Sequence, residues 1–186
     1  KLKGKFIEKK LAGNAQNIED LAIDASNNVY LAAGDIYIWD KSKNSFKIHI
    51  KKNGPFLRVS SGPPGTLWAI NNDGKLFELL GGKLLKRPGK GEFKANDVDI
   101  SINGDVYVTS EVLTVTSTER RRGQPPITTT QVLKCYLYKY NSAKRTIEHA
   151  FDANDIYAEI VSISREGSPW YTSPGCENKN VYYGVK

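Results

Sequence analysis

The sequence predicts an all-β protein built from four copies of one four-stranded unit, and two observations lead to that prediction. First, an apolar pair at alternate positions, a turn-forming link and a short strand with a central aromatic recur four times, with the aromatics at Tyr30, Trp68, Tyr107 and Trp170. Second, each copy becomes more polar toward its last strand. This gradient is typical of a β-propeller blade, whose first strand lines a central channel and whose fourth faces solvent.

The second copy shows the pattern most regularly. Residues 67–70 and 75–79 form two short strands, and Asn72, Asp73 and Gly74 between them tolerate the positive φ of a tight hairpin turn. One four-stranded sheet cannot bury both of its faces alone, so the copies must stack. We therefore expect the four central aromatics, called the anchors below, to form the packing between neighbouring sheets.

The predicted fold class is a β-propeller of four four-stranded blades in a single domain over residues 1–186. The repeats span about 13–50, 51–88, 89–150 and 151–186. The fourth copy has three predicted strands, whereas residues 5–11 are patterned like a fourth strand. We expect residues 5–11 to pair with residues 181–184 and close the ring. Because four blades is an uncommon number, a homodimer that forms a larger ring is the alternative.

The third copy contains an insertion at residues 110–133. Its flanks alternate Thr with apolar residues, which favours β-strands, and its centre carries Arg120, Arg121 and Arg122 beside a turn. The prediction is a long hairpin that offers three arginines to an acidic protein partner; a disordered surface loop is the alternative. Without interleaved aromatics, three arginines make nucleic acid an unlikely ligand.

Charge and cysteine content set further bounds. The 27 Lys and Arg residues outnumber the 20 Asp and Glu residues, giving a net charge of +7, which favours anionic partners but also fits a merely solvated surface. No apolar run approaches the roughly 18 residues that span a bilayer.

The two cysteines, Cys135 and Cys176, fall at the same end of equivalent strands in neighbouring copies. We predict that they form a disulfide, with two free thiols as the alternative, and a disulfide would indicate a secreted or extracellular protein.

The second copy resembles a tectonin repeat, the β-propeller unit of tachylectin-like and tectonin lectins. The resemblance rests on a Val-Ser start at Val59, on Gly65-Thr-Leu-Trp68, on Asn71-Asn-Asp-Gly74, on the aromatic Phe77 and on a closing Arg87-Pro-Gly89. The third copy carries a weaker form of the repeat. The first copy is equally similar to NHL or gluconolactonase-like propeller repeats. The resemblance implies a carbohydrate-binding protein without a cofactor.

Aromatic rings stack on the apolar faces of sugars while neighbouring amides and carboxylates bond to the hydroxyls. On this basis the candidate ligand-binding residues are Trp39, Trp68, Asn71, Asn72, Asp73 and Trp170. Catalytic residues and a metal site are not predicted, because no catalytic motif or His/Cys metal spacing occurs. Five acidic residues could approach the channel mouth, where gluconolactonase-like enzymes hold a metal, but turn and edge roles are favoured for them: Asp20, Asp24, Asp97, Asp99 and Glu159.

The sequence therefore predicts a non-catalytic, tectonin-like propeller that binds carbohydrate, including an anionic surface glycan or lipopolysaccharide. The alternative function is a protein-interaction scaffold that presents the basic hairpin to an acidic partner.

Overall fold

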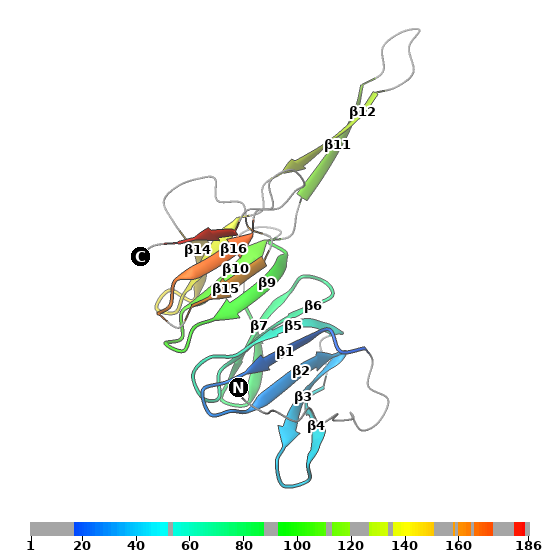
Figure 1. Ribbon diagram of the computed structural model, residues 1–186. Coiled ribbons are helices and arrows are strands. Elements are labelled where there is room, and N and C mark those ends of the chain that lie inside the picture. Colours follow the sequence, from blue (N-terminus) through cyan, green and yellow to red (C-terminus); the bar gives the residue numbers. More distant parts are fainter. Residues whose placement is uncertain are drawn as a thin grey trace, which may run out of the picture.

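The computed structural model describes residues 17–51, 54–87, 93–110, 113–119, 127–133, 136–150, 158, 160–164, 166–172 and 181–184. In these residues the regular structure is β throughout, arranged as antiparallel sheets that follow one another along the chain (Figure 1). The described residues include no helix long and apolar enough to cross a membrane.

Each of the first three sheets has four strands. The first contains β1 (Asp20–Ile23), β2 (Val29–Ala33), β3 (Asp35–Asp40) and β4 (Ser45–Ile50). The second contains β5 (Phe56–Ser60), β6 (Leu67–Asn71), β7 (Leu76–Leu80) and β8 (Lys83–Lys86). The third contains β9 (Ala95–Ile100), β10 (Val106–Ser110), β13 (Leu137–Asn141) and β14 (Thr146–His149). The predicted propeller-blade sheets are thereby confirmed.

The fourth sheet has three described strands, β15 (Ile160–Ile163), β16 (Pro169–Thr172) and β17 (Val181–Tyr183). A separate two-stranded sheet pairs β11 (Leu113–Glu119) with β12 (Ile127–Leu133) and extends away from the stacked sheets in Figure 1. It lies between the second and third strands of the third sheet, within the predicted insertion.

Turn chemistry explains why the hairpins close where they do. Asn27, Asn44 and Gly74 adopt positive φ angles of 58°, 49° and 70° in the turns of the first two sheets. Asparagine and glycine reach this region at little cost, so these positions fix the strand register. In the second sheet the turn brings Leu76 opposite Ile70 and Phe77 opposite Ala69.

Consecutive sheets pack face to face through three apolar cores. Tyr30 and Val59 belong to the core between the first and second sheets, and Trp68 and Val98 to the core between the second and third. Tyr107 and Val161 belong to the core between the third and fourth. Three of the four anchors are therefore buried between sheets, where the repeat pattern places them.

The described strands of the first and fourth sheets do not share a packed interface of this kind. The closing strand expected at residues 5–11 lies outside the described residues, so its pairing with residues 181–184 stays a prediction. What the structure shows is a run of four packed sheets, with the first strand of each on a common inner side.

Candidate functional site: a polar cavity between the inner strands

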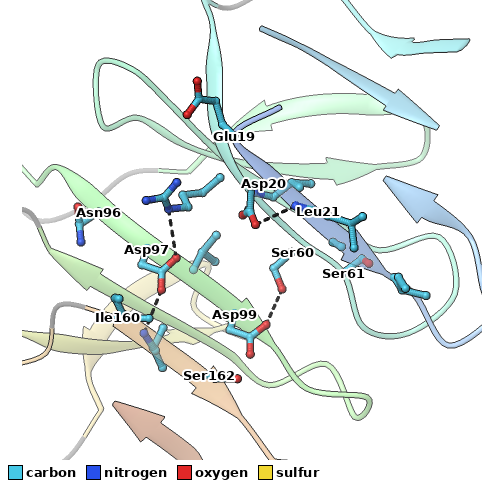
Figure 2. Close-up of a pocket in the computed structure, with 16 residues that line it drawn as sticks. Glu19, Asp20, Leu21, Ser60, Ser61, Asn96, Asp97, Asp99, Ile160 and Ser162 are labelled. Carbon is cyan, nitrogen blue, oxygen red and sulfur yellow. Dashed lines mark hydrogen bonds and ion pairs between the residues drawn. The ribbon is translucent and has the colours of Figure 1, made fainter. Parts of the chain in front are cut away.

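The first strands of all four sheets line one open cavity of about 570 Å³. Figure 2 shows Asp20, Asp97 and Asp99 gathered around it from β1 and β9, with Ser60 between them. Glu19, Arg58 and Asn96 add further polar groups. Exposed apolar side chains border the same space at the two ends of the run of sheets: Leu21, Ile23 and Ile160.

The two-residue period of a strand places these side chains. In β9, Val98 and Ile100 are buried in the core, whereas Asp97 and Asp99 alternate with them and face the cavity. The same alternation gives β5 the buried Val59 and the half-buried Arg58. β5 and β9 thus place apolar side chains in the core and polar side chains toward the cavity.

The cavity carboxylates also join neighbouring sheets. The Asp20 carboxylate in the first sheet accepts the Val59 N–H of the second sheet at 2.9 Å. Asp97 in the third sheet accepts the Val161 N–H of the fourth at 3.0 Å, so the same relationship occurs at two junctions. An inner strand has no partner strand on its channel side, and these carboxylates satisfy the N–H groups it presents there.

A second set of contacts between sheets involves the cavity-facing residues Ser60 and Asp99. The Ser60 hydroxyl donates to Asp99 at 2.7 Å and accepts the Ile100 N–H at 3.1 Å, joining the second and third sheets. Asp99 in turn accepts the Ile163 N–H at 2.7 Å, joining the third and fourth. Asp20, Asp97 and Asp99 therefore bond to N–H groups at the edges of neighbouring inner strands, and they also line the channel.

Charge in the cavity is predominantly negative. Burial raises the pKa of Asp97 to about 6, although the Val161 N–H and the Arg58 guanidinium act in the opposite direction. Arg58 Nε lies 3.7 Å from the Asp97 carboxylate and partly balances its charge. Glu19, Asp20 and Asp99 add three further acidic groups to the same lining.

The aspartates keep the capacity to accept further hydrogen bonds. An ionised carboxylate offers about four lone-pair sites, and Asp20 receives the N–H groups of Leu21 and Val59. The cavity can therefore bind a ligand that donates several hydrogen bonds and has apolar edges. Within the described residues, no group of three or more His, Cys, Asp or Glu side chains is placed to hold a metal ion.

The structure places the three predicted tryptophans on three different sheets. Trp68 is buried between the second and third sheets, with its ring edge-on to Tyr140 at a centroid distance of 4.7 Å. Trp39 is half-buried on the first sheet and edge-on to Phe46 at 5.0 Å. Trp170 is partly exposed on the fourth sheet. None of them lines the central cavity.

The predicted polar ligands form a turn. Asn71 is buried, and its side-chain oxygen accepts the N–H groups of Asp73 and Lys75 at 3.1 and 2.9 Å. Asn72 and Asp73 are exposed, and Asp73 pairs with Lys75 at 2.6 Å. These turn residues border a smaller groove of about 140 Å³ next to the third sheet.

Several candidates fall outside the described residues: Arg120, Arg121, Arg122, Cys135, Glu159 and Cys176. Asp24 takes the favoured turn role, accepting the N–H groups of Ser26 and Asn28. The polar cavity residues missing from the predicted set are Glu19, Arg58, Ser60, Ser61, Asn96 and Ser162. Arg58 and Ser60 alternate with Leu57 and Val59, the apolar pair of the predicted innermost strand. This alternation is the signal that could have identified them.

No protein-family model matches the chain, and no curated protein matches its sequence. Its fold is similar to the extracellular domain of BT4673 from B. thetaiotaomicron, with a TM-score of 0.60 and 11% identity over 96% of this chain and 22% of that chain. It is similar to the computationally designed Ika4 protein, with a TM-score of 0.57 and 12% identity over 97% of this chain and 98% of that one.

The third similar structure is the WD40 β-propeller domain of Doa1. The TM-score is 0.55, and the two are 17% identical over 87% of this chain and 49% of that chain. The chain thus spans about a fifth of the BT4673 chain and about half of the Doa1 chain. Identities this low show the fold alone, and that fold is the blade arrangement of β-propellers.

Proposed function

We propose that the chain is a non-catalytic binding protein whose central cavity binds carbohydrate. The observation that carries the proposal is the composition of the cavity, in which carboxylates of Asp20, Asp97 and Asp99 lie close to exposed aliphatic side chains. A sugar offers hydroxyl donors around its edge and C–H groups on its faces, which matches acceptors beside apolar groups. Tectonin-like lectins, which the second repeat resembles, belong to the same functional class.

The charge of the cavity favours a neutral or amino sugar over an anionic one. Among the described lining residues, four are acidic, Glu19, Asp20, Asp97 and Asp99, and one is a cation, Arg58. Phosphate or carboxylate groups of a ligand would meet like charges at short range, which is unfavourable in a partly buried site. Anionic glycans and lipopolysaccharide therefore fit the basic protein surface better than this cavity.

A glycan array of neutral, amino and anionic sugars tests the proposal. We expect binding to neutral or amino sugars. Glu19→Gln should weaken binding of an amino sugar, because it removes a negative charge that attracts the amine. Arg58→Gln should weaken binding of a neutral sugar, because it removes guanidinium hydrogen-bond donors. Both substitutions change a cavity group while leaving in place the side chains that accept N–H groups of neighbouring sheets. Lys47→Gln on β4 is the matched control, because it also removes one cation and one ion pair but lies outside the cavity lining.

Thermal melts of all variants should show that the fold is retained. Failure of the protein to bind any immobilised glycan would remove the carbohydrate proposal. Unchanged affinity in both cavity variants would move the binding site away from the cavity, toward the exposed face around Trp39 or Trp170.

A second candidate function is favoured by the projecting β11–β12 hairpin. Its strands pair in register from Leu113 opposite Leu133 to Glu119 opposite Ile127, and Figure 1 shows them away from the stacked sheets. An isolated two-stranded sheet is marginally stable in water, so a partner that covers it would stabilise it. We propose an acidic protein partner for this element. Deleting residues 119–126 should abolish binding to an acidic peptide such as poly-glutamate and leave glycan binding intact.

We further propose that the protein is secreted or extracellular. The support is the predicted Cys135–Cys176 disulfide, since such bonds persist mainly in oxidising compartments. The thiol measurement described in the Discussion tests this support directly.

A further inference from the structure

The central cavity and the smaller groove beside the third sheet share part of their lining. Arg58 on β5 and Asn96 on β9 border both the cavity of about 570 Å³ and the groove of about 140 Å³. Figure 2 shows Asn96 at the side of the cavity, one residue before Asp97 on the same strand. The groove is therefore a continuation of the cavity, and it lies near the beginnings of β5 and β9.

The turn between β6 and β7 forms the wall of the groove that the cavity does not share, and backbone hydrogen bonds hold this turn from two sides. The Asn72 N–H donates to the Pro55 carbonyl at 2.8 Å, and the Ala95 N–H donates to the Gly74 carbonyl at 2.8 Å. A Cβ atom at Gly74 would lie only 2.9 Å from the Cβ of Lys94, so the turn packs directly on the third sheet. The groove wall is thus already ordered, which lowers the cost of binding a ligand there.

Arg58 is held at the junction of the two spaces. Its Nη1 donates to the Leu57 carbonyl at 3.0 Å, and its Nε lies 3.7 Å from the Asp97 carboxylate. A guanidinium carries five N–H donors, so these two contacts leave donors for a ligand. The Arg58 side chain is also 41% exposed. Arg58 can therefore donate hydrogen bonds to a ligand that extends from the cavity into the groove.

The groove repeats the chemical composition of the cavity. The exposed side chains of Asn72 and Asp73 supply an amide and a carboxylate, and Leu57, which is 37% exposed, supplies an aliphatic surface. Hydrogen-bonding groups beside an aliphatic side chain suit the hydroxyl edge and the C–H face of a sugar. The two connected spaces thus offer the same kind of contact twice.

We propose that the groove is a second sugar subsite, so that the site binds a linear oligosaccharide of two or more units. This inference rests on the proposed carbohydrate function of the cavity. One unit lies in the cavity beside Asp20 and Asp97, and the adjoining unit lies in the groove against Leu57 and the Asn72 amide. Arg58 donates to ligand oxygens where the two units join.

Titration calorimetry with sugars of increasing length tests the proposal. The probes are glucose, galactose, mannose and glucosamine, each as the monomer and as linear homo-oligomers of two to four units. In a series that binds, we expect the dimer to bind at least about tenfold more tightly than the monomer, because binding of the second unit is intramolecular once the first is held.

Substitutions in the groove should remove this gain. Asn72→Ala and Leu57→Ala should each reduce the ratio of dimer to monomer affinity toward one, since both residues line the groove and not the cavity. Asn72→Ala keeps the backbone bond to Pro55. Asn103→Ala is the matched control, because Asn103 is also an exposed turn asparagine but follows β9 at its other end. This control should keep the wild-type ratio.

Nuclear magnetic resonance locates the second unit independently of affinity. The amide signals of Asn72 and Gly74 should shift when the dimer is added and stay in place when the monomer is added. The Asp97 amide signal should shift with both sugars.

Equal affinity for monomer and dimer in every series that binds would overturn the second subsite and leave the carbohydrate function of the cavity standing. A gain from the second unit that both groove variants retain would also overturn it, because the second unit would then lie elsewhere. Failure of every probe to bind would overturn both proposals.

Discussion

The carboxylate of Asp20 in the first sheet accepts the backbone N–H of Val59 in the second at 2.9 Å, and Asp97 repeats this contact with Val161 at 3.0 Å. Neighbouring inner strands are therefore joined by side chains where a continuous sheet would use backbone carbonyls. The same carboxylates line the cavity, so residues that stabilise the stack also determine the charge of the candidate site.

Asp20→Ala should destabilise the protein by about 1–3 kcal/mol, because the Val59 N–H loses its acceptor. Urea denaturation followed by circular dichroism measures the change. Asp73→Ala is the control, since Asp73 lies in an exposed turn and pairs only at the surface with Lys75. Equal stability of the two variants would show that solvent replaces the carboxylate at Val59.

The free energy of unfolding should fall as the pH rises and Asp97 loses its proton. Burial raises its folded-state pKa to about 6 from the ordinary value of 3.8, so the folded chain holds this proton more tightly than the unfolded chain. The resulting stabilisation is complete below about pH 4 and is lost as the pH rises through about 6, and two pKa units correspond to at most about 3 kcal/mol.

The measurement compares wild type with Asp97→Asn across this range. The amide keeps an acceptor for the Val161 N–H but does not ionise beside Arg58 and Asp20. The difference between the two proteins isolates Asp97 from the other carboxylates. We expect wild type to lose about 1–3 kcal/mol relative to the variant between about pH 4 and 7. Parallel pH profiles would contradict the raised pKa.

Trp68→Ala should cost about 3–5 kcal/mol, a large part of the roughly 5–15 kcal/mol that stabilises a domain. Trp68 fills the core between the second and third sheets, so its removal leaves a cavity there. Thermal unfolding measures the loss, with the exposed Leu80→Ala as the control. A variant that keeps the wild-type melting temperature would show that Trp68 is not a packing residue.

Alanine substitutions at two adjacent residues, Ser61 and Gly62, should change the stability of the protein in different directions. A Cβ atom at Gly62 would overlap the backbone oxygen of Ser101, so Gly62→Ala should destabilise by about 1–3 kcal/mol or more. Among the described residues the buried Ser61 hydroxyl has no hydrogen-bond partner, so Ser61→Ala should be neutral or stabilising. Chemical denaturation of both variants checks the pair, and a destabilised Ser61→Ala would reveal a partner for the hydroxyl.

The two cysteines are predicted to form one disulfide that closes a loop of about 40 residues and contributes roughly 3–4 kcal/mol in the chain-entropy model. Thiol titration under denaturing, non-reducing conditions should find no free thiol in the purified protein. Two free thiols per chain would remove both the bridge and the main support for secretion.

Local sequence alone determined the sheets. The alternation of apolar residues in β5 and β9, the aromatic anchors and the Asn and Gly turn residues are short-range signals, and each acts within one sheet. The burial of Tyr30, Trp68 and Tyr107 was predictable for the same reason, because a repeated strand pattern repeats its packing face.

Only the tertiary structure decided which polar residues share a site. Asp20, Ser60 and Asp97 are far apart in the chain. The repeat pattern allowed Asp20 and Asp97 to approach a channel mouth, but it did not distinguish them from Asp24, which takes a turn role. Asp20, Ser60 and Asp97 meet because the four first strands converge on one cavity. Sequence analysis grouped the three tryptophans by their chemistry. They lie on three different sheets because each belongs to a different repeat. Which residues converge depends on the stacking of sheets, and stacking is a long-range property that no single repeat encodes.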